Sequence, residues 1–288
     1  MAADRAVLML GAPVVDAIKA DIAERVAKLA AEGVRVGLGT ILVGDDPASA
    51  RYVAMKRAAC EELGISAPHV HIDASGSQSD LMAAVDRFNR DPGIHGFLVQ
   101  NPVPAGFDFN EAMQAIDPAK DADGLHPVNL GLLGLGVQGA PRPCTPMGIQ
   151  ALLAHYEVPV AGRHVVIVGR GLTLGRPLSM LLSLKEPGAN AAVTVVHTGV
   201  PDIAAYTRQA DIVVAAVGVA GIIQPDMVKP GAAVVGGGQS YEGKKALSDV
   251  DESVGEVAGW ITPRIGGVGP TTVAMLLRNA VVAASRTV

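Results

Sequence analysis

A tyrosine and a lysine stand four residues apart in the segment DPASARYVAMK, which spans residues 46–56. Asp46 and Pro47 form a typical N-cap and first-turn proline, so a helix is predicted to place Tyr52 and Lys56 on one face. A lysine acts as an acid or base near neutral pH only when burial or neighbouring groups lower its pKa. The pair could therefore move protons, with the Tyr hydroxyl orienting the amine. On spacing alone, an ordinary amphipathic surface pair is the preferred interpretation.

Two further polar residues could gather near such a pair. Gln100 ends the predicted strand 94–100, and ligands gather at the carboxyl ends of parallel strands. Asp123 lies in the sequence KDADG, where its carboxylate could bind a polar heterocycle. Asp-Gly is also a strong turn dipeptide, so a solvated turn is the alternative. Because ligands often bind between domains, these residues favour a cleft site for a small molecule.

A glycine-rich turn in the second half has the order strand, turn, helix that nucleotide sites use. The segment HVVIVGRGLTLGRP contains Gly169, Gly171 and Gly175. Glycines let the backbone approach a pyrophosphate, and the free amides of the helix start stabilise its charge. The spacing differs from the common Gly-x-Gly-x-x-Gly, so the interpretation depends on the surrounding strands and helices, and a structural turn is the alternative.

The nucleotide is predicted to be NADP, with NAD as the alternative. An NAD site tends to carry an acid about 20 residues on, at the end of the next strand. Here that strand ends in VVHTG, without a carboxylate. The missing acid and Arg170 in the turn favour a phosphorylated ribose, although arginine is commonly just exposed. His197 is a candidate neighbour of the adenosine.

These residues need a scaffold, and the pattern of the first part of the chain predicts one. Strands and helices are expected to alternate, which is typical of parallel βαβ units. The expected elements are a helix over 13–31, a strand over 34–44, a helix over 47–63, a strand over 69–73, a helix over 79–89, a strand over 94–100 and a short helix over 110–115.

A second alternating block follows a Gly- and Pro-rich segment, 117–146, which has no sustained period and is interpreted as a connection between lobes. The expected elements are a helix over 145–156, a strand over 164–169, a helix over 175–185, a strand over 193–197, a helix over 202–209, a strand over 211–217, a short helix near 226 and a strand over 232–235. A last helix from Pro270 could pack back onto the first lobe. The predicted class is α/β with two lobes, 1–118 plus 270–288 and 141–268.

Composition narrows the class of protein. The chain has 288 residues, of which 49% are hydrophobic, enough for two domains. The net charge of −5 offers no basic field, so neither nucleic acid nor an anionic membrane is an expected partner. No run approaches the ~18 apolar residues of a membrane span. Cys60 and Cys144 lie far apart in no metal-ligand spacing, which predicts no metal site, no disulfide framework and a reducing cytoplasm.

Seven motifs follow one another along almost the whole chain: VGDDPASARYVAMK, GFLVQNPVP, KDADGLHPVNLG, PCTPMGI, VGRGLTLGRP, ADIVVAAVG and GGVGPTT. In these motifs and in their order the chain closely resembles the bifunctional methylenetetrahydrofolate dehydrogenase/methenyltetrahydrofolate cyclohydrolase family. So many motifs in order are far more specific than any one of them.

The resemblance implies an N-terminal catalytic folate lobe that the last helix joins, a C-terminal Rossmann-like NADP lobe, folate in the cleft and a homodimer. It implies NADP-dependent oxidation of 5,10-methylenetetrahydrofolate and hydrolysis of the methenyl product to 10-formyltetrahydrofolate, in one-carbon metabolism and purine biosynthesis. The implied catalytic residues are Lys56, its supporting Tyr52, Gln100 that tunes the lysine, and Asp123 that binds the pterin. The implied cofactor residues are Gly169, Arg170, Gly171, Thr173, Gly175, His197, Thr198 and Gly218. The implied folate contacts are Tyr52, Gln100, Asp123, Gly267 and Pro270.

The chain departs from the family's usual residues at five places. Asn101 replaces Leu, Gly171 replaces Ser, Thr271 replaces Met, Gly236-Gly237-Gly238 replaces Asp-Val-Gly, and Arg264-Ile265 replaces Val-Pro. The lost hydroxyl at Gly171 weakens the inference of NADP, and the last two changes are expected in loops near nicotinamide and folate. Two alternatives therefore stay open: a cyclohydrolase with impaired hydride transfer, and a noncatalytic folate- or nucleotide-binding paralogue.

Overall fold

The computed structural model describes residues 6–243 and 245–287. They form two compact α/β units. We call Ala17–Cys144 with Val273–Val288 the three-stranded unit, and Met1–Asp16 with Thr145–Thr272 the six-stranded unit. The two expected lobes and the placement of the last helix with the first lobe are thus present. The bounds differ from those expected, because the chain up to Asp16 groups with the second block and 119–144 groups with the first.

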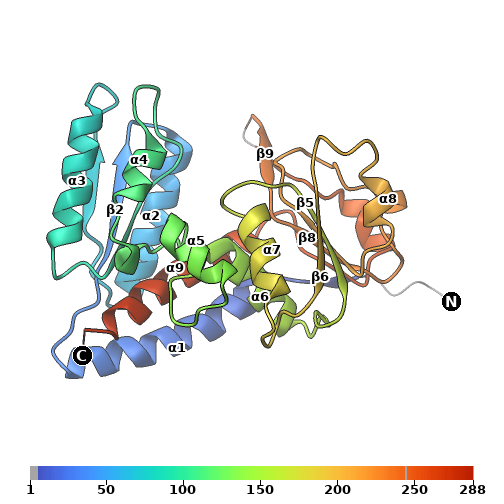
Figure 1. The fold of residues 1–288 in the computed structure, drawn as a ribbon, viewed down its shortest axis with the longest axis horizontal. Coiled ribbons are helices and arrows are strands. Elements are labelled where there is room, and N and C mark those ends of the chain that lie inside the picture. Colours follow the sequence, from blue (N-terminus) through green and yellow to red (C-terminus); the bar gives the residue numbers. More distant parts are fainter. Residues whose placement is uncertain (1–5, 244, 288) are drawn as a thin grey trace. The chain divides into compact units, whose positions relative to one another are not determined.

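The sheet of the three-stranded unit has the order β3-β2-β4, and both strand pairs are parallel. Its strands are β2 (Leu38–Val43), β3 (His69–Ile72) and β4 (Gly96–Val99). Every residue of β2 is buried, which is typical of a central parallel strand covered on both faces. Helices α2 and α3 contact β2, and α4 contacts β4 (Figure 1).

The helices around this sheet begin where the sequence provides caps. Asp46 accepts a hydrogen bond from the amide of Ser49 at the start of α2, and Ser77 and Asp80 form a capping box at α3. The helices are α2 (Pro47–Glu62), α3 (Gln78–Arg90), α4 (Phe109–Gln114), α5 (Pro127–Gly134) and a 3₁₀ turn (Pro118–Lys120), with most of α1 (Gly11–Ala31) and α9 (Val268–Ala284).

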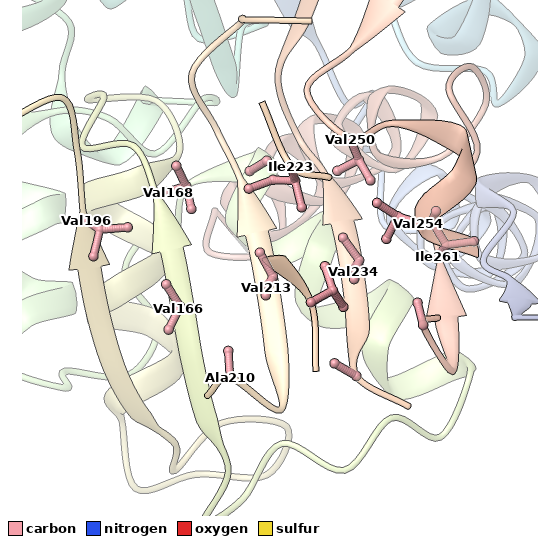
Figure 2. Close-up of a cluster of buried hydrophobic side chains, with 14 residues drawn as sticks. Val166, Val168, Val196, Ala210, Val213, Ile223, Val234, Val250, Val254 and Ile261 are labelled. Carbon is pink, nitrogen blue, oxygen red and sulfur yellow. The ribbon is translucent and has the colours of Figure 1, made fainter. Parts of the chain in front are cut away.

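The sheet of the six-stranded unit has the order β1-β11-β8-β7-β5-β6, with every pair parallel. Its strands are β1 (Val7–Leu8), β5 (His164–Val168), β6 (Ala192–Val196), β7 (Ile212–Ala215), β8 (Ala233–Gly236) and β11 (Trp260–Ile261). Figure 2 shows Val166, Val168, Val213, Val234 and other apolar side chains gathered over one face of neighbouring strands. Val166 and Val168 share that face because strand side chains alternate with a period of two.

The remaining elements of this unit are short helices and one antiparallel hairpin. They are α6 (Cys144–His155), α7 (Gly175–Ser183), α8 (Ala204–Thr207), the 3₁₀ turns Pro225–Met227 and Glu252–Glu256, and the hairpin strands β9 (Gln239–Glu242) and β10 (Lys245–Ser248). In the described part of the chain, no helix is long and apolar enough to cross a membrane.

The alternating strands and helices are confirmed, with ends that differ by a few residues. The segment 117–146, for which no helix was predicted, contains a 3₁₀ turn and α5. Glycine has a low helix propensity, so the glycines of α5 gave no helical signal in the sequence. A tertiary hydrogen bond stabilises this helix: the buried Asn129 side chain donates to the Asp121 carboxylate at 2.9 Å. The two-residue strands β1 and β11 and the hairpin β9–β10 were not predicted, since such short strands show no period.

Candidate functional site

Tyr52 and Lys56 lie one turn apart on α2, as the spacing predicted. The helix is fixed at its start by the Asp46 cap, with Pro47 at its first position. Tyr52 exposes 38% of its surface, so its ring is available to a ligand. Lys56 is partly buried rather than extended into water, which argues against the surface-pair interpretation.

Gln100 holds the Lys56 amine. Its backbone continues the sheet beyond β4, since its amide donates to the carbonyl of Ile41 at 2.8 Å. Lys56 Nζ donates to Gln100 Oε1 at 3.1 Å, and Gln100 Nε2 donates to the carbonyl of Asn101 at 2.8 Å. The second bond fixes which end of the amide faces the amine. A residue 44 positions away thus orients Lys56 without adding a charge.

Asp123 belongs to the same cluster. Burial raises the pKa of its carboxyl above 3.8, the charge of Lys56 opposes the rise, and the charge of Asp121 adds to it. Lys56 and Asp123 are therefore close enough to influence each other. A carboxyl that resists ionisation when no ligand is present can act as a hydrogen-bond donor or acceptor toward a heterocycle that reaches it.

Asp121, which the sequence did not single out, builds the turn that presents Asp123. Its buried carboxylate accepts hydrogen bonds from the amides of Gly124 at 2.9 Å and His126 at 2.8 Å, besides the side chain of Asn129. The adjacent Ala122 donates to the carbonyl of Phe97 on β4 at 3.3 Å. The turn thus extends the sheet edge, and its signal in the sequence was the Asp-x-Asp-Gly pattern itself.

Asn279 on α9 secures that turn from the other side. Its amide nitrogen donates to the carbonyls of Ala122 at 2.9 Å and Arg142 at 3.0 Å. Cys144 also donates to the Ala122 carbonyl, at 3.2 Å, and burial raises its pKa well above 9.0. The buried thiol is therefore structural. Asn279 carried no local signal in the sequence because its partners lie more than 130 residues away.

The glycine-rich turn of the six-stranded unit requires glycine at two of its three predicted positions. Gly169 has φ of +122°, and a Cβ there would lie 2.4 Å from the carbonyl oxygen of Ala216. A Cβ on Gly175 would lie 2.2 Å from the carbonyl oxygen of Gly169. Gly171 faces open space. This backbone leaves a cradle that side chains would fill, directly before α7, whose start has no side-chain cap. A dinucleotide pyrophosphate fits such a turn.

The other predicted cofactor residues lie at the same edge of the sheet. The amide of Gly169 donates to the carbonyl of Val196 at 2.7 Å, so His197 and Thr198 follow immediately beside the turn. His197 Nδ1 accepts from the amide of Gly199 at 3.0 Å, which makes at least one ring nitrogen part of a local turn. Arg170 and Thr173 are exposed in the turn, and Gly218 follows β7.

A second acid missed by the sequence reading holds the loop of Gly218. Asp249 is fully buried, and its Oδ2 accepts from the amides of Val217 at 2.8 Å and Gly218 at 3.1 Å. A Cβ on Gly238 would lie 2.1 Å from this oxygen. The glycine at this position, which the family shares, is thus required by the Asp249 contact. At the two positions that depart from the family, a Cβ on Gly236 would lie 2.5 Å from the Ser248 hydroxyl oxygen and a Cβ on Gly237 would lie 2.5 Å from the Leu174 side chain.

Gly267 and Pro270, the predicted folate contacts of this unit, flank the start of α9. Gly266 next to them accepts from the amide of Gly11 at 2.7 Å. Thr271 is buried and donates to the carbonyl of Val268 at 2.8 Å. A Cβ on Gly148 would lie 2.5 Å from the Thr271 hydroxyl oxygen, so the Thr in place of the usual Met is packed against α6.

Two family models match the chain. The tetrahydrofolate dehydrogenase/cyclohydrolase catalytic domain matches residues 9–123, and the NAD(P)-binding domain of the same family matches residues 143–288.

Individual relatives agree with these matches. The chain is 61% identical over 277 residues to the bifunctional protein FolD of Syntrophotalea carbinolica, covering 96% of this chain and 95% of that protein. The crystal structure of the FolD dehydrogenase/cyclohydrolase from Campylobacter jejuni superposes with a TM-score of 0.93 at 39% identity, covering 98% and 99% of the two chains. The Trypanosoma brucei enzyme, solved with NADP and an inhibitor, gives 0.92 at 37% identity and 99% of each chain.

Proposed function

The chain belongs to the tetrahydrofolate dehydrogenase/cyclohydrolase family, and on that premise we propose that Lys56, Tyr52, Gln100 and Asp123 perform its folate chemistry. It is a bifunctional enzyme that oxidises 5,10-methylenetetrahydrofolate with NADP and hydrolyses the methenyl product to 10-formyltetrahydrofolate. The observation that supports the residue roles best is the 3.1 Å bond from Lys56 to Gln100 beside Asp123.

In the hydrolytic step, Lys56 moves protons. Water adds to the cationic methenyl carbon and loses a proton, leaving a hydroxyl on that carbon. The hydroxyl then loses its proton as the formyl C=O bond forms, the bond from the carbon to N5 breaks and N5 takes up a proton, so one proton is released in total. We assign to the Lys56 amine, which Gln100 holds at 3.1 Å, the transfer of the protons that leave the added water and reach N5. Gln100 keeps the amine in position without supplying a negative charge that would hold its proton.

Asp123 and Tyr52 orient the folate. A carboxyl in a site of low polarity can exchange two hydrogen bonds with the amino-pyrimidine edge of a pterin, and binding of that polar edge offsets the cost of burying the acid. The partly exposed ring of Tyr52 offers a face on which a heterocycle can stack. Together they place the one-carbon bridge near Lys56.

The six-stranded unit provides the residues for the oxidation. Gly169, Gly175 and the start of α7 would hold the pyrophosphate of NADP, and Arg170 would face the 2′-phosphate. NADP, when bound, accepts the hydride that leaves the methylene bridge. The backbone around Gly169 and Gly218 fixes where the cofactor loops lie and leaves the acid-base chemistry to the other unit.

Separate assays of the two steps test this function. Enzyme, methylenetetrahydrofolate and either NADP or NAD are mixed and methenyl formation is followed, and the decay of added methenyltetrahydrofolate is followed in a second experiment. Turnover in both is expected. Decay without formation would favour the monofunctional cyclohydrolase, and binding without either step would favour the noncatalytic paralogue.

Arg170→Ala tests the assignment of the phosphate contact. Arg170 is exposed at the glycine turn, so its loss should lower kcat/KM with NADP about five- to tenfold and leave the value with NAD within twofold. An unchanged preference for NADP would refute the assignment.

Assembly and location complete the proposal. We propose that the enzyme is a homodimer, which light scattering would test, and that it acts in the cytoplasm, in line with its two buried free cysteines. Its formylated product would supply purine biosynthesis.

A further inference from the structure

The loop 262–267 connects β11 to α9, and its C-terminal end is hydrogen-bonded to the first residue of α1. The amide of Gly11 donates to the carbonyl of Gly266 at 2.7 Å, and a Cβ on Gly11 would lie 2.3 Å from the carbonyl oxygen of Gly267. The start of α1 therefore lies directly on the glycine pair. Because an added methyl group on Gly11 would collide with both carbonyl oxygens, this close contact requires glycine at position 11.

Arg264 fastens the near end of the same loop to the hairpin β9–β10. Its Nη1 donates to the carbonyl of Ala246 on β10 at 2.7 Å, and its Nε donates to Glu252 Oε1 at 3.1 Å. Its own carbonyl accepts from Gln239 Nε2 on β9 at 3.2 Å. Both the side chain and the backbone of Arg264 thus contact the hairpin or the turn after it.

The main-chain bond is the stronger part of this fastening. The Glu252 side chain is 77% exposed, and exposed ion pairs contribute little because water screens them. The Ala246 carbonyl is a fixed backbone acceptor, and the planar guanidinium can serve it and Glu252 at once. A lysine at position 264 would have a single donor nitrogen in place of the several N–H donors of the guanidinium, and a valine would have no donor.

The segment 246–249, to which Arg264 is hydrogen-bonded, also bonds the loop that contains Gly218, a predicted cofactor residue. Three residues after Ala246, Asp249 accepts the amides of Val217 and Gly218. The stretch 246–249 is therefore a common support with two separate attachments: Arg264 for the loop of Gly267, and Asp249 for the loop of Gly218.

We propose that Arg264 is a positioning residue for the folate substrate: by tying 262–267 to the hairpin, it fixes the loop that presents Gly267 and Pro270. The proposal rests on the assignment of those two residues to folate binding. It follows that loss of Arg264 weakens binding of both folate substrates, methylene and methenyl, while NADP binding, which depends on Asp249, is spared.

The test measures KM for each substrate in Arg264→Val, with Arg208→Val as the matched control. Arg208 lies in the same unit and likewise donates to a backbone carbonyl, that of Asp226, at 2.8 Å, but away from both loops. Arg264→Val is expected to raise KM for methylenetetrahydrofolate and for methenyltetrahydrofolate about tenfold, with KM for NADP within twofold. Arg208→Val is expected to leave all three within twofold.

Two further variants keep the result interpretable. Arg264→Lys retains a donor for Ala246 and should restore at least half of the lost affinity, whereas Glu252→Gln should change KM less than twofold. Unchanged folate KM in Arg264→Val, or an equal rise in the KM for NADP, would overturn the proposal. If the wild-type protein fails to turn over methylenetetrahydrofolate, the proposed function fails instead, so the two failures are distinct.

Discussion

In the proposed function, the two units contribute through different parts of the chain. In the three-stranded unit the contributors are side chains: an amine, an amide and a carboxyl that come from α2, the end of β4 and the turn after it. In the six-stranded unit the contributor is the backbone, which can approach a phosphate because Gly169 and Gly175 have no Cβ. Activity should therefore be lost when a reacting side chain of the three-stranded unit is replaced by one of similar shape without its polar group. In the glycine turn of the six-stranded unit, activity should be lost when a methyl group is added, although no reacting group is removed.

The largest expected effect is that of Lys56→Met in the side-chain region. Methionine fills similar space but cannot accept or donate the proton, so hydrolysis of methenyltetrahydrofolate should fall about 10²–10⁴-fold with folate binding within threefold. The rate of methenyl decay measures the loss. Lys19→Met is the control, because Lys19 pairs with the exposed Glu62 on the surface of the same unit. Persisting hydrolysis would refute the role of Lys56.

Gly169→Ala should have the next largest effect, in the backbone region. The methyl group would collide with the Ala216 carbonyl at a φ of +122°, which costs roughly 1–3 kcal/mol. The dissociation constant for NADP should rise about 10–100-fold, measured by fluorescence titration, while added methenyltetrahydrofolate is still hydrolysed. Gly171→Ala meets no neighbouring atom and should change NADP affinity far less. Equal losses in the two variants would contradict the steric explanation.

Asn279→Ala sharpens the comparison by removing a support of the side-chain site without touching its reacting groups. The carbonyls of Ala122 and Arg142 lose the Asn279 amide as a donor, and the Ala122 carbonyl keeps only the weak donor of the Cys144 thiol, so the free energy of unfolding should fall by about 1–3 kcal/mol. Because the Asp123 turn loosens, KM for folate should rise about fivefold in steady-state assays. Ser285→Ala, directly after the end of the same helix, removes a bond to the Val281 carbonyl and is the control. A drop in stability with no change in KM would make Asn279 structural only.

The smallest effect concerns the pH dependence of the ligand-free protein. Because the folded-state pKa of Asp123 is raised above 3.8, its stabilising contribution is present below 3.8 and is lost as the pH rises through the raised pKa. Asp123→Asn has no carboxyl that ionises here, so it does not lose this contribution. The difference in melting temperature, variant minus wild type, should therefore increase by about 2–4 °C from pH 4 to pH 8. A constant difference across this range would show that the carboxyl ionises normally.

The same contrast explains what the sequence could predict. Regular strands and helices, the i,i+4 pair on α2 and the glycine turn are local patterns, so they were read correctly. The partners that hold them are distant in the chain: Asn279 reaches Ala122 across 157 positions, and Asp249 reaches Gly218 across 31. Whether Lys56 extends into water or bonds Gln100 also depends on a contact across 44 positions. Spacing alone contains no information on these contacts.

Likewise, the departures from family residues were ambiguous in sequence and acquire a reason in the structure. A Cβ at Gly236 would lie 2.5 Å from the Ser248 hydroxyl oxygen and a Cβ at Gly237 would lie 2.5 Å from the Leu174 side chain, and Thr271 fits against Gly148. Arg264 replaces an apolar residue with a tether to β10. For Asn101, whose carbonyl accepts from Gln100 but whose side chain is exposed, nothing in the structure explains the change from Leu.

A single-turnover experiment tests the division of labour most directly. Wild type, Lys56→Met and Gly169→Ala are each mixed with methylenetetrahydrofolate and subsaturating NADP, and methenyl absorbance is followed over time. We predict that methenyltetrahydrofolate accumulates and persists with Lys56→Met, forms and decays with wild type, and forms slowest with Gly169→Ala. Decay at the wild-type rate with Lys56→Met would contradict the assignment of hydrolysis to the side-chain site.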